Sequence, residues 1–174
     1  RRKLHDCVLC LDDMAELAGL ITCVREKRGS IDFDLPEPEI ILDIGGGVSG
    51  IIRAERLNAH RIIEEFMISA NEAVARFFEE RRLSALFRVH EPPEPEKLRD
   101  FERLLRSLGI GHRKLGTTGA LQDVQSEVCG TQYEFIVNRV LLRSMKQARY
   151  SARNRGHFGL ASESYLHFTS PIRR

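Results

Sequence analysis

The sequence has no long apolar run, and its 174 residues include only 6 prolines and 13 glycines. Crossing a bilayer takes about 20 consecutive apolar residues, so we expect no transmembrane helix and no membrane partner. The modest proline and glycine content excludes collagen-like and low-complexity chains. With 42% hydrophobic and 30% charged residues, the composition is typical of a soluble globular protein. The N-terminal residues lack the cleavage pattern of a signal peptide, and we expect a cytoplasmic protein.

Several catalytic and metal-binding patterns are also missing. No group of closely spaced aspartates indicates a two-metal centre, and no ordered Ser, His and Asp with a nucleophile elbow indicates a hydrolase triad. Cys7 and Cys10 form a lone C-x-x-C without a second pair or a nearby histidine pair, which is a weak match to a closed zinc site. We favour the interpretation that the four cysteines are small core residues in a reducing compartment.

Charge is distributed unevenly along the chain. The formal net charge is +2, from 27 Lys and Arg against 25 Asp and Glu. Residues 139–174 contain eight basic residues and one acidic residue, Glu163, and so carry +7, which leaves −5 on residues 1–138. A concentrated basic segment is typical of a surface that meets a polyanion. Charge alone leaves nucleic acid and an ordinary solvated basic surface as open alternatives.

Hydrophobic periodicity predicts one α+β domain over residues 1–174, with long amphipathic helices packed on a small, mainly antiparallel sheet. Helices are expected over 4–28 and 58–82, in a segment ending near Gly109, in a weakly amphipathic stretch at 121–128, and over 131–149. Extended segments are expected at 31–35, 39–44, 48–53 and 85–90. The tail at 150–174 lacks helical periodicity and is expected to be extended or looped.

Gly45, Gly47 and Gly50 formally match the glycine fingerprint of dinucleotide-binding folds. That motif requires a helix after the glycines, because the pyrophosphate binds at the N-terminus of the helix. Here residues 51–53 have the character of a strand, and three consecutive glycines separate two β-like runs. A hairpin is therefore favoured, and a nucleotide-dependent redox enzyme is a hypothesis that a strand after Gly50 would exclude.

Two adjacent glutamates lie in the predicted 58–82 helix. On a helical wheel Glu65 lies on the outer side, whereas Glu64 borders the apolar arc on the same side as Asn71. A carboxylate in the position of Glu64 can accept hydrogen bonds from a ligand hydroxyl at the edge of a cleft. An ordinary boundary glutamate is the alternative interpretation.

The C-terminal third offers two candidate contacts to nucleic acid. Arg139, Arg143 and Lys146 have i, i+4 and i+7 spacing and form one basic stripe on the predicted 131–149 helix, which could follow a phosphate backbone. Residues 157–174 interleave aromatic rings with His and Arg, a pattern that suits stacking on single-stranded bases. A solvated helix face and a frayed basic terminus are the alternatives.

The last residues also suggest a phosphate site. Ser170 and Pro171 are residue types favoured at the N-cap and the first position of a helix. A helix N-terminus binds phosphate through its free N–H groups. An arginine placed there could stabilise charge that develops on a phosphoryl group, and Arg173 and Arg174 follow directly.

Six segments together resemble a known family. They are R-G-S-I-D-F-D-L-P-E at 28–37, N-A-H-R-I-I-E-E-F-M at 58–67 with A-N-E-A-V-A following, A-L-F-R-V-H-E-P-P at 85–93, L-L-R-S-M-K-Q-A at 141–148, H-F-G-L-A at 157–161 and H-F-T-S-P-I-R-R at 167–174. In order and spacing they resemble the RNB catalytic domain of the ribonuclease R and ribonuclease II family. Within that family their residues are most similar to those of bacterial ribonuclease R.

The resemblance implies a processive 3′→5′ exoribonuclease that hydrolyses single-stranded RNA to nucleoside 5′-monophosphates. It assigns Arg173 to stabilising the scissile phosphate and Arg174 to a further phosphate contact. It assigns Glu64 to holding the sugar of the terminal nucleotide, which contributes to the preference for RNA over DNA. Phe33 lies near the family's base-stacking aromatic. The stripe that begins at Arg139 has no such counterpart, and its RNA-binding role depends on charge and spacing.

The resemblance also implies partners outside the chain. In the family, an aspartate cluster upstream of the matching region holds Mg²⁺, and RNA-binding barrel domains flank the catalytic domain. We therefore expect the second half of an RNB domain, without magnesium ligands of its own and inactive alone. Its exposed half-domain surface could promote dimers. The alternative hypothesis is a non-catalytic RNA-binding or scaffold protein with the same fold.

Overall fold

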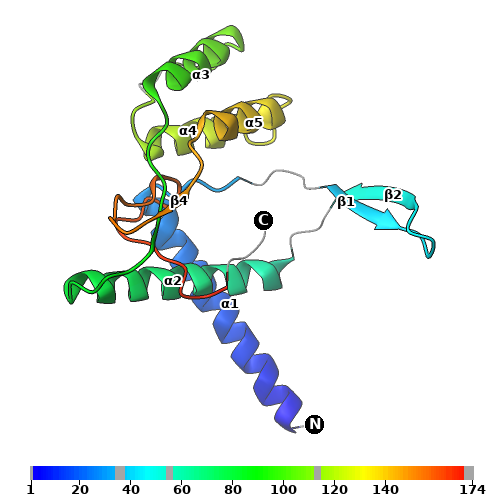
Figure 1. Ribbon diagram of the computed structural model, residues 1–174. Coiled ribbons are helices and arrows are strands. Elements are labelled where there is room, and N and C mark those ends of the chain that lie inside the picture. Colours follow the sequence, from blue (N-terminus) through cyan, green and yellow to red (C-terminus); the bar gives the residue numbers. More distant parts are fainter. Residues whose placement is uncertain (1, 34–37, 54–56, 112–114, 171–174) are drawn as a thin grey trace.

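The computed structural model describes residues 2–33, 38–53, 57–111 and 115–170 (Figure 1). Within these ranges the chain forms five α-helices, two antiparallel sheets of two strands each and one short 3-10 helix. The elements in chain order are α1 (Arg2–Arg28), β1 (Pro38–Leu42), β2 (Val48–Arg53), α2 (Asn58–Glu80), β3 (Phe87–Val89), α3 (Pro95–Ser107), α4 (Thr118–Val128), α5 (Glu134–Ser144), β4 (Arg149–Ser151) and η1 (Phe158–Leu160). This architecture confirms the predicted α+β class.

Most predicted elements are found close to their expected positions. Helix α2 falls within the predicted 58–82, and β3 falls within 85–90. Helix α3 ends shortly before Gly109, which has a φ of +72° and reverses the chain. Helix α4 contains the amphipathic stretch at 121–128 and begins at a Thr117 cap, whose hydroxyl accepts a hydrogen bond from Ala120 N. Local patterning therefore accounts for these four elements.

Helix α1 crosses α2 near its C-terminal end, and its N-terminal half extends away from the rest of the molecule (Figure 1). It ends at Gly29, whose φ of +101° lies in the left-handed region. A Cβ at Gly29 would also lie 2.6 Å from Thr118 Oγ1, so glycine is required there. Large apolar side chains along α1 are exposed, from Val8 to Val24. No helix of the described part is long and apolar enough to cross a bilayer.

The four cysteines are free and exposed, so the prediction that they are small core residues is wrong. Cys7, Cys10 and Cys23 lie on α1, and Cys129 follows α4. The helical stripe that contains Cys7 is present, but only Ala18 of that stripe is buried in the described structure. Periodicity identified the helix correctly without showing which part of it another element covers.

Strands β1 and β2 form the predicted hairpin around the three consecutive glycines. Asp43 holds the turn, because its carboxylate accepts hydrogen bonds from Gly45 N and Gly47 N, each at 2.8 Å. Gly46 has a φ of +80°, which favours glycine. Strand β2 continues through Gly50, so no helix follows the glycine motif. The dinucleotide-binding hypothesis is therefore wrong.

The main core lies where α3, α4 and α5 meet (Figure 1). Its buried members are Ile31, Phe101, Leu105, Leu115, Leu121, Val124, Val128, Val137, Leu141 and Met145. A second, smaller cluster joins Ala75 of α2 to Phe87 and Val89 of β3 and to Leu166 of the C-terminal segment. This second cluster brings the C-terminal segment against α2.

Helix α5 ends at Ser144, well before the predicted end at 149. Met145 is extended (φ −70°, ψ 147°), and residues 149–151 form β4, which pairs with β3. Backbone pairing with β3 takes the place of further helical hydrogen bonds, so a tertiary contact overrides the local pattern. Lys146 therefore lies beyond the helix, and the prediction that it shares one helical stripe with Arg139 and Arg143 is wrong.

The segments between α1 and β1 and after β4 contain little regular structure in the described residues, and a hydrogen bond joins them. Residues 31–33 form no strand, contrary to the prediction for 31–35, whose last two residues lie outside the described ranges. Ile31 N instead donates to Gly159 O at 2.8 Å. Farther along, Arg88 N of β3 donates to Tyr165 O at 2.8 Å. The C-terminal segment is therefore fixed to both β3 and the end of α1.

Candidate nucleic-acid interface

One face of α2 carries two buried polar residues, Glu64 and Asn71, which are 7% and 2% exposed. Residues seven positions apart in an α-helix lie on the same face, two turns or about 10 Å apart along the axis. The helical wheel predicts that Glu64 and Asn71 lie on one side of the helix, and both are buried in α2. A carboxylate and an amide are thus held in register on a single rigid element.

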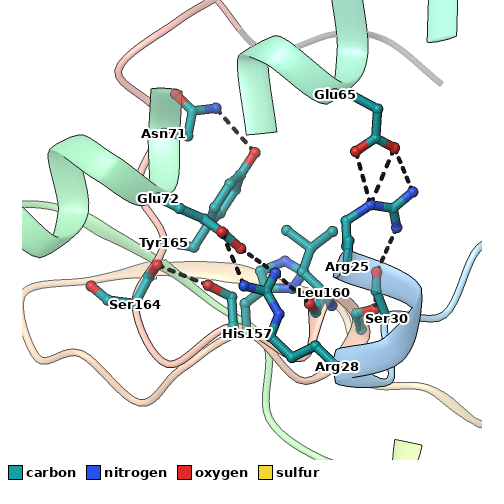
Figure 2. Close-up of polar contacts among 12 residues, drawn as sticks. Arg25, Arg28, Ser30, Glu65, Asn71, Glu72, His157, Leu160, Ser164 and Tyr165 are labelled. Carbon is teal, nitrogen blue, oxygen red and sulfur yellow. Dashed lines mark hydrogen bonds and ion pairs between the residues drawn. The ribbon is translucent and has the colours of Figure 1, made fainter. Parts of the chain in front are cut away.

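Glu65 is also buried, so the prediction that it faces outward is wrong. Arg25 of α1 donates to it through Nε, at 3.2 and 3.1 Å from the two carboxylate oxygens, and through Nη2, at 2.6 Å from Oε1 (Figure 2). Arg25 Nη1 also donates to Ser30 Oγ at 2.6 Å. The periodicity of α2 could not reveal that α1 covers this position. Glu65 therefore joins α1 to α2.

A second ion pair fixes the end of α1 beside α2. Arg28 Nη2 lies 2.5 Å from Glu72 Oε1 and donates to Leu160 O at 3.2 Å. Ser30 Oγ adds a bond of 3.4 Å to Gly159 O. The turn that contains η1 is consequently bound to the end of α1, where Arg28 also pairs with Glu72 of α2, as Figure 2 shows.

The C-terminal segment is fastened to α2 at Asn71. The side-chain Nδ2 donates to Tyr165 Oη at 3.0 Å (Figure 2). The side-chain Oδ1 accepts from Phe168 N and Thr169 N, both at 2.9 Å, and from Thr169 Oγ1 at 3.2 Å. Every polar atom of this side chain therefore has a partner in the segment that leads to the C-terminal motif.

The residues predicted to contact phosphate, Arg173 and Arg174, lie outside the described residues, as does Pro171 of the predicted helix start. Ser170 is described, is exposed and is not helical. The backbone just before it is bound to the helix that carries Glu64. The structure therefore brings together Glu64's helix and the segment that continues into Arg173.

Phe33, the predicted stacking residue, is half-buried and packs against the core cluster of α3, α4 and α5. The preceding residue is fixed because Gln125 Nε2 donates to Asp32 O at 3.0 Å. Ser30, on the same segment, accepts from Arg25. Phe33 thus lies on a segment that is anchored both to the core and to the α1–α2 junction.

Histidine rings pack between β3 and the C-terminal segment, and sequence analysis missed this cluster. The His157 ring meets the rings of His90 and Tyr165 edge-on, with centroids 5.0 and 5.3 Å apart. Burial lowers the pKa of His157 to about 3, and the positive charges of neighbouring groups, His90 and Arg88, act in the same direction. Burial also lowers the pKa of His90. Both rings are therefore neutral near pH 7.

The neutral histidines stabilise the turn around η1 by accepting backbone hydrogen bonds. His157 Nδ1 accepts from Leu160 N at 3.2 Å, and His90 Nδ1 accepts from Gly159 N at 3.1 Å. A protonated ring could not accept at Nδ1. The H-F-G-L-A motif was visible in the sequence, but its contact with His90 depends on pairing across many residues.

An open cleft of about 620 Å³ presents a mainly basic surface on another part of the molecule. It is lined by Glu91, Lys97, Arg143, Met145, Lys146, Gln147 and Arg149. Arg143 and Lys146 of the predicted stripe thus meet in this cleft although only Arg143 is helical. Arg139 is exposed on α5 with its guanidinium 5.8 Å from the centroid of the Phe135 ring.

Glu91 binds basic side chains in this cleft and beside it. Arg149 and Arg155 each donate to it at 2.7 Å, and Lys146 Nζ lies 3.6 Å away. The hydrogen bonds from the two arginines lower the pKa of Glu91 to about 2. One carboxylate therefore holds three cations in place, and the cleft keeps an excess of positive charge suited to phosphate.

No three His, Cys, Asp or Glu side chains within the described ranges are grouped to hold a metal ion. The residues present there do not fit a magnesium site. The expectation that magnesium ligands come from outside this chain stays a prediction.

Comparison with known proteins gives one consistent family. The sequence matches the family model described as RNB domain over residues 5–174. It is 45% identical over 175 residues to Ribonuclease R of Aquifex aeolicus (strain VF5), a match that covers 99% of this chain and 25% of that protein. The chain spans between 20% and 26% of the length of the curated relatives it matches.

Solved structures agree with the sequence matches. Mycoplasma genitalium RNase R in complex with ribose methylated single-stranded RNA is 31% identical with a TM-score of 0.89, over 96% of this chain and 27% of that chain. A structure of yeast Ssd1, a pseudonuclease, is 24% identical with a TM-score of 0.60, over 69% of this chain and 16% of that chain. The second likeness shows the fold alone.

Proposed function

The chain belongs to the RNB domain family, and from this membership we propose that it forms part of the catalytic domain of a processive 3′→5′ exoribonuclease. The substrate is single-stranded RNA, and the products are nucleoside 5′-monophosphates. Support comes from ribonuclease R relatives that match along nearly the whole chain and from a structural neighbour solved with single-stranded RNA. This chain matches 20% to 26% of the length of those relatives, and in this proposal the activity also requires residues outside it.

The observation that carries the proposal is the junction between α2 and the C-terminal segment. Glu64 is buried on the face of α2 to which Asn71 binds Phe168 N and Thr169 N. The S-P-I-R-R motif follows at once in the sequence. One helix thereby carries a candidate group for the ribose and binds the segment that leads, in the sequence, to a candidate group for the phosphate.

In this proposal Glu64 holds the sugar of the 3′-terminal nucleotide. A carboxylate accepts hydrogen bonds from ribose hydroxyls, and the 2′-hydroxyl is the group that distinguishes RNA from DNA. Burial strengthens such a bond because water competes less for the carboxylate. Hydrogen bonding of Glu64 to the ribose hydroxyls accounts for a preference for RNA over DNA.

Arg173 is proposed to stabilise charge that develops on the scissile phosphate, and Arg174 to contact a neighbouring phosphate. A guanidinium has five N–H donors in a planar fork that matches phosphate oxygens. Phe33 is proposed to stack on a terminal base. Arg139 and the cations of the basic cleft, Arg143 and Lys146, are proposed to contact the RNA backbone farther from its 3′ end.

Magnesium, when bound in the larger protein, would supply activation of a water molecule for attack on the terminal phosphodiester. The residues described here provide no group suited to hold it. The side chains of this chain instead bind the RNA, orient its 3′ end and offer positive charge to the phosphate.

Replacing Arg173 tests this function. In the product of the complete open reading frame, Arg173→Ala should lower kcat by about 100-fold or more, the usual cost of losing one group that stabilises developing charge. The dissociation constant for RNA should change by only a few-fold. Rates come from release of monophosphates from labelled RNA, and affinity from fluorescence anisotropy.

Arg99→Ala provides the control, because Arg99 is an exposed arginine on α3. It should leave both quantities unchanged. Equal losses of kcat and affinity in Arg173→Ala would contradict a role in stabilising the transition state.

A second candidate function is a non-catalytic RNA-binding protein. The likeness to a pseudonuclease shows that this fold also occurs in a protein so described. RNA binding by the complete product without any release of monophosphates would favour this alternative.

A further inference from the structure

Two arginines converge on a single carboxylate oxygen of Glu91. Arg149 Nη2 and Arg155 Nη1 each donate a hydrogen bond to Glu91 Oε1 at 2.7 Å. The two nitrogens therefore lie no farther apart than twice this distance. Like charges at such a separation repel each other, and long side chains lose rotamer entropy when they are held in one place. The shared carboxylate offsets both effects.

Backbone hydrogen bonds fix the three residues relative to one another. Arg149 lies in β4, opposite a β3 residue that is two positions before Glu91. Gly156, which follows Arg155 directly, accepts a hydrogen bond from His90 N at 3.0 Å. The backbone that carries both arginines is therefore bound to the residues just before Glu91.

The ion pairs leave much of each guanidinium accessible. The side chains of Arg149 and Arg155 are 58% and 53% exposed, whereas that of Glu91 is 25% exposed. A guanidinium has five N–H donors in a planar fork, and Glu91 accepts one from each arginine in the hydrogen bonds described above. Both side chains can thus donate to a second anion without releasing Glu91.

The surroundings of the two arginines carry an excess of positive charge. Lys146 Nζ lies 3.6 Å from Glu91 Oε2 and 3.9 Å from Glu94 Oε1. Lys97 and Arg143 line the same cleft. The two arginines bring this group to five cations and two carboxylates. A polyanion is the kind of ligand that such a surface attracts.

We propose that Arg149 and Arg155 form a guanidinium pair that binds the phosphodiester backbone of single-stranded RNA, and that Glu91 is the positioning residue that holds the pair together. This inference rests on the proposed function and adds two RNA contacts and one positioning residue to it. Two guanidiniums that are already held in place lose less entropy on binding than two free side chains. A contact to phosphate depends neither on the base nor on the 2′-hydroxyl.

The first experiment measures RNA affinity against salt concentration in the product of the complete open reading frame. A chelator withholds Mg²⁺, so that the RNA stays intact, and fluorescence anisotropy gives the affinity. Arg149→Ala and Arg155→Ala should each weaken binding and make the slope of log affinity against log salt shallower by about 0.7, the value for one phosphate contact on a single strand. The fold loss should be the same for single-stranded DNA of equal length and sequence.

Arg103→Ala is the matched control. Arg103 is also an exposed arginine that pairs with a carboxylate, that of Asp100, and it lies on α3. This variant removes the same positive charge, so an effect of net charge alone would appear in it equally. Its salt slope should equal that of the wild type.

Two variants of Glu91 separate positioning from charge. Glu91→Gln and Glu91→Leu remove the same negative charge, but glutamine keeps an acceptor oxygen for the arginines and leucine has none. Glu91→Leu should therefore bind RNA about 2- to 10-fold more weakly than Glu91→Gln, the cost of ordering one long side chain. Charge alone predicts that both variants bind RNA equally and more tightly than the wild type. Glu91→Met replaces Glu91→Leu if thermal unfolding shows that the leucine variant does not fold.

Equal RNA affinity of Glu91→Leu and Glu91→Gln would overturn the positioning role. Unchanged salt slopes in Arg149→Ala and Arg155→Ala, or a loss confined to RNA with DNA binding unchanged, would overturn the guanidinium pair. Each of these results leaves the proposed function standing if the wild type releases monophosphates from RNA once Mg²⁺ is added. A wild type that binds RNA but releases none would instead overturn the proposed function.

Discussion

Single buried side chains decide what the candidate interface can bind. Glu64 and Glu65 are adjacent and both buried, and Glu65 accepts three hydrogen bonds from Arg25. Glu64 lies two helical turns from Asn71 on one buried face of α2. The two carboxylates therefore have separate roles, one structural and one proposed for the RNA sugar.

Changing Glu64 should alter the choice between sugars. Glu64→Gln keeps the size of the side chain and one acceptor oxygen but removes the charge. A hydrogen bond to a charged group contributes about 1.5–3 kcal/mol and one between neutral groups about 0.5–1.5 kcal/mol. The difference of about 1–1.5 kcal/mol should lower discrimination roughly five- to tenfold. The measurement compares kcat/KM for all-RNA substrates with that for substrates whose 3′-terminal nucleotide is 2′-deoxy.

Glu80→Gln, a change of the same kind at an exposed position on α2, should keep the wild-type discrimination. If Glu64→Gln also kept it, the ribose contact would be contradicted.

The neutral histidines predict a loss of stability in acid. The pKa of His157 is about 3 in the folded protein, against an ordinary value of 6.5, so the unfolded chain binds more protons between these values. The contribution of neutral His157 to the free energy of unfolding is present in full above pH 6.5 and is lost as the pH decreases toward 3. The loss is at most about 1.4 kcal/mol for each pH unit inside that window. Urea denaturation at pH 7.5, 6.5 and 5.5 measures it.

His157→Gln should flatten this dependence, because glutamine can accept from Leu160 N and does not titrate. His60→Gln, at an exposed position on α2, should retain the full dependence. If the free energy of unfolding depended on pH equally in the wild type and in His157→Gln, His157 would not be the cause of the loss of stability in acid.

Sequence patterns predicted some of these residues and not others. The apolar periodicity of α2 is enough to predict on which side of that helix Glu64 lies. The burial of Glu65 and the neutral state of His157 depend on Arg25 and on His90, which come from distant parts of the chain. Contacts of that kind have no local signal.

At the scale of elements, the crossing of α1 and α2 holds the interface together. Two ion pairs join the helices at positions seven residues apart on α2, from Arg25 to Glu65 and from Arg28 to Glu72. The first pair is buried, whereas Arg28 is 36% exposed. The buried pair also fixes Ser30, which begins the segment that carries Phe33.

The two pairs should differ greatly in their effect on stability. Arg25→Ala leaves the Glu65 carboxylate buried without its partner, and we expect the free energy of unfolding to fall by about 3–5 kcal/mol. Arg28→Ala removes a partly exposed pair and should cost about 1 kcal/mol or less. Urea denaturation of both variants checks this. If the two variants lost the same free energy of unfolding, the Arg25–Glu65 ion pair would not be the main contact that holds α1 to α2.

The elements themselves were predictable where local rules suffice. Helices α2 and α3 follow from apolar periodicity, and the β1–β2 hairpin follows from its glycines. The end of α5 and the formation of β4 were not predictable, because pairing with β3 decides them. The cysteines of α1 were misassigned because periodicity does not show which half of a helix is covered.

On the scale of the whole molecule, the described structure leaves large apolar surfaces uncovered. Exposed apolar residues lie along α1, from Val8 to Val24, and along the β1–β2 hairpin, from Ile40 to Ile52. Contiguous exposed apolar surface is typical of contacts with other protein. The dimer expected from the sequence stays a prediction. The chain matches 20% to 26% of the length of its curated relatives, and its being one portion of a larger domain stays a prediction.

Family membership was predictable because its motifs are spread along the chain and keep their order. The roles of Arg173 and Arg174 stay predictions, since these residues lie outside the described ranges. The basic cleft was only partly foreseen. Its cations Arg143 and Lys146 had been identified by spacing, but Glu91, which holds several of them together, had not.

One assay tests the central claim most directly. The product of the complete open reading frame and the 174-residue chain are incubated separately with Mg²⁺ and single-stranded RNA, labelled at its 5′ end in one set and throughout its length in another. We predict that the first shortens the RNA progressively from its 3′ end with release of nucleoside 5′-monophosphates, and that the second releases none. Binding without degradation by the complete product, or sustained magnesium-dependent release by the 174-residue chain, would contradict the account.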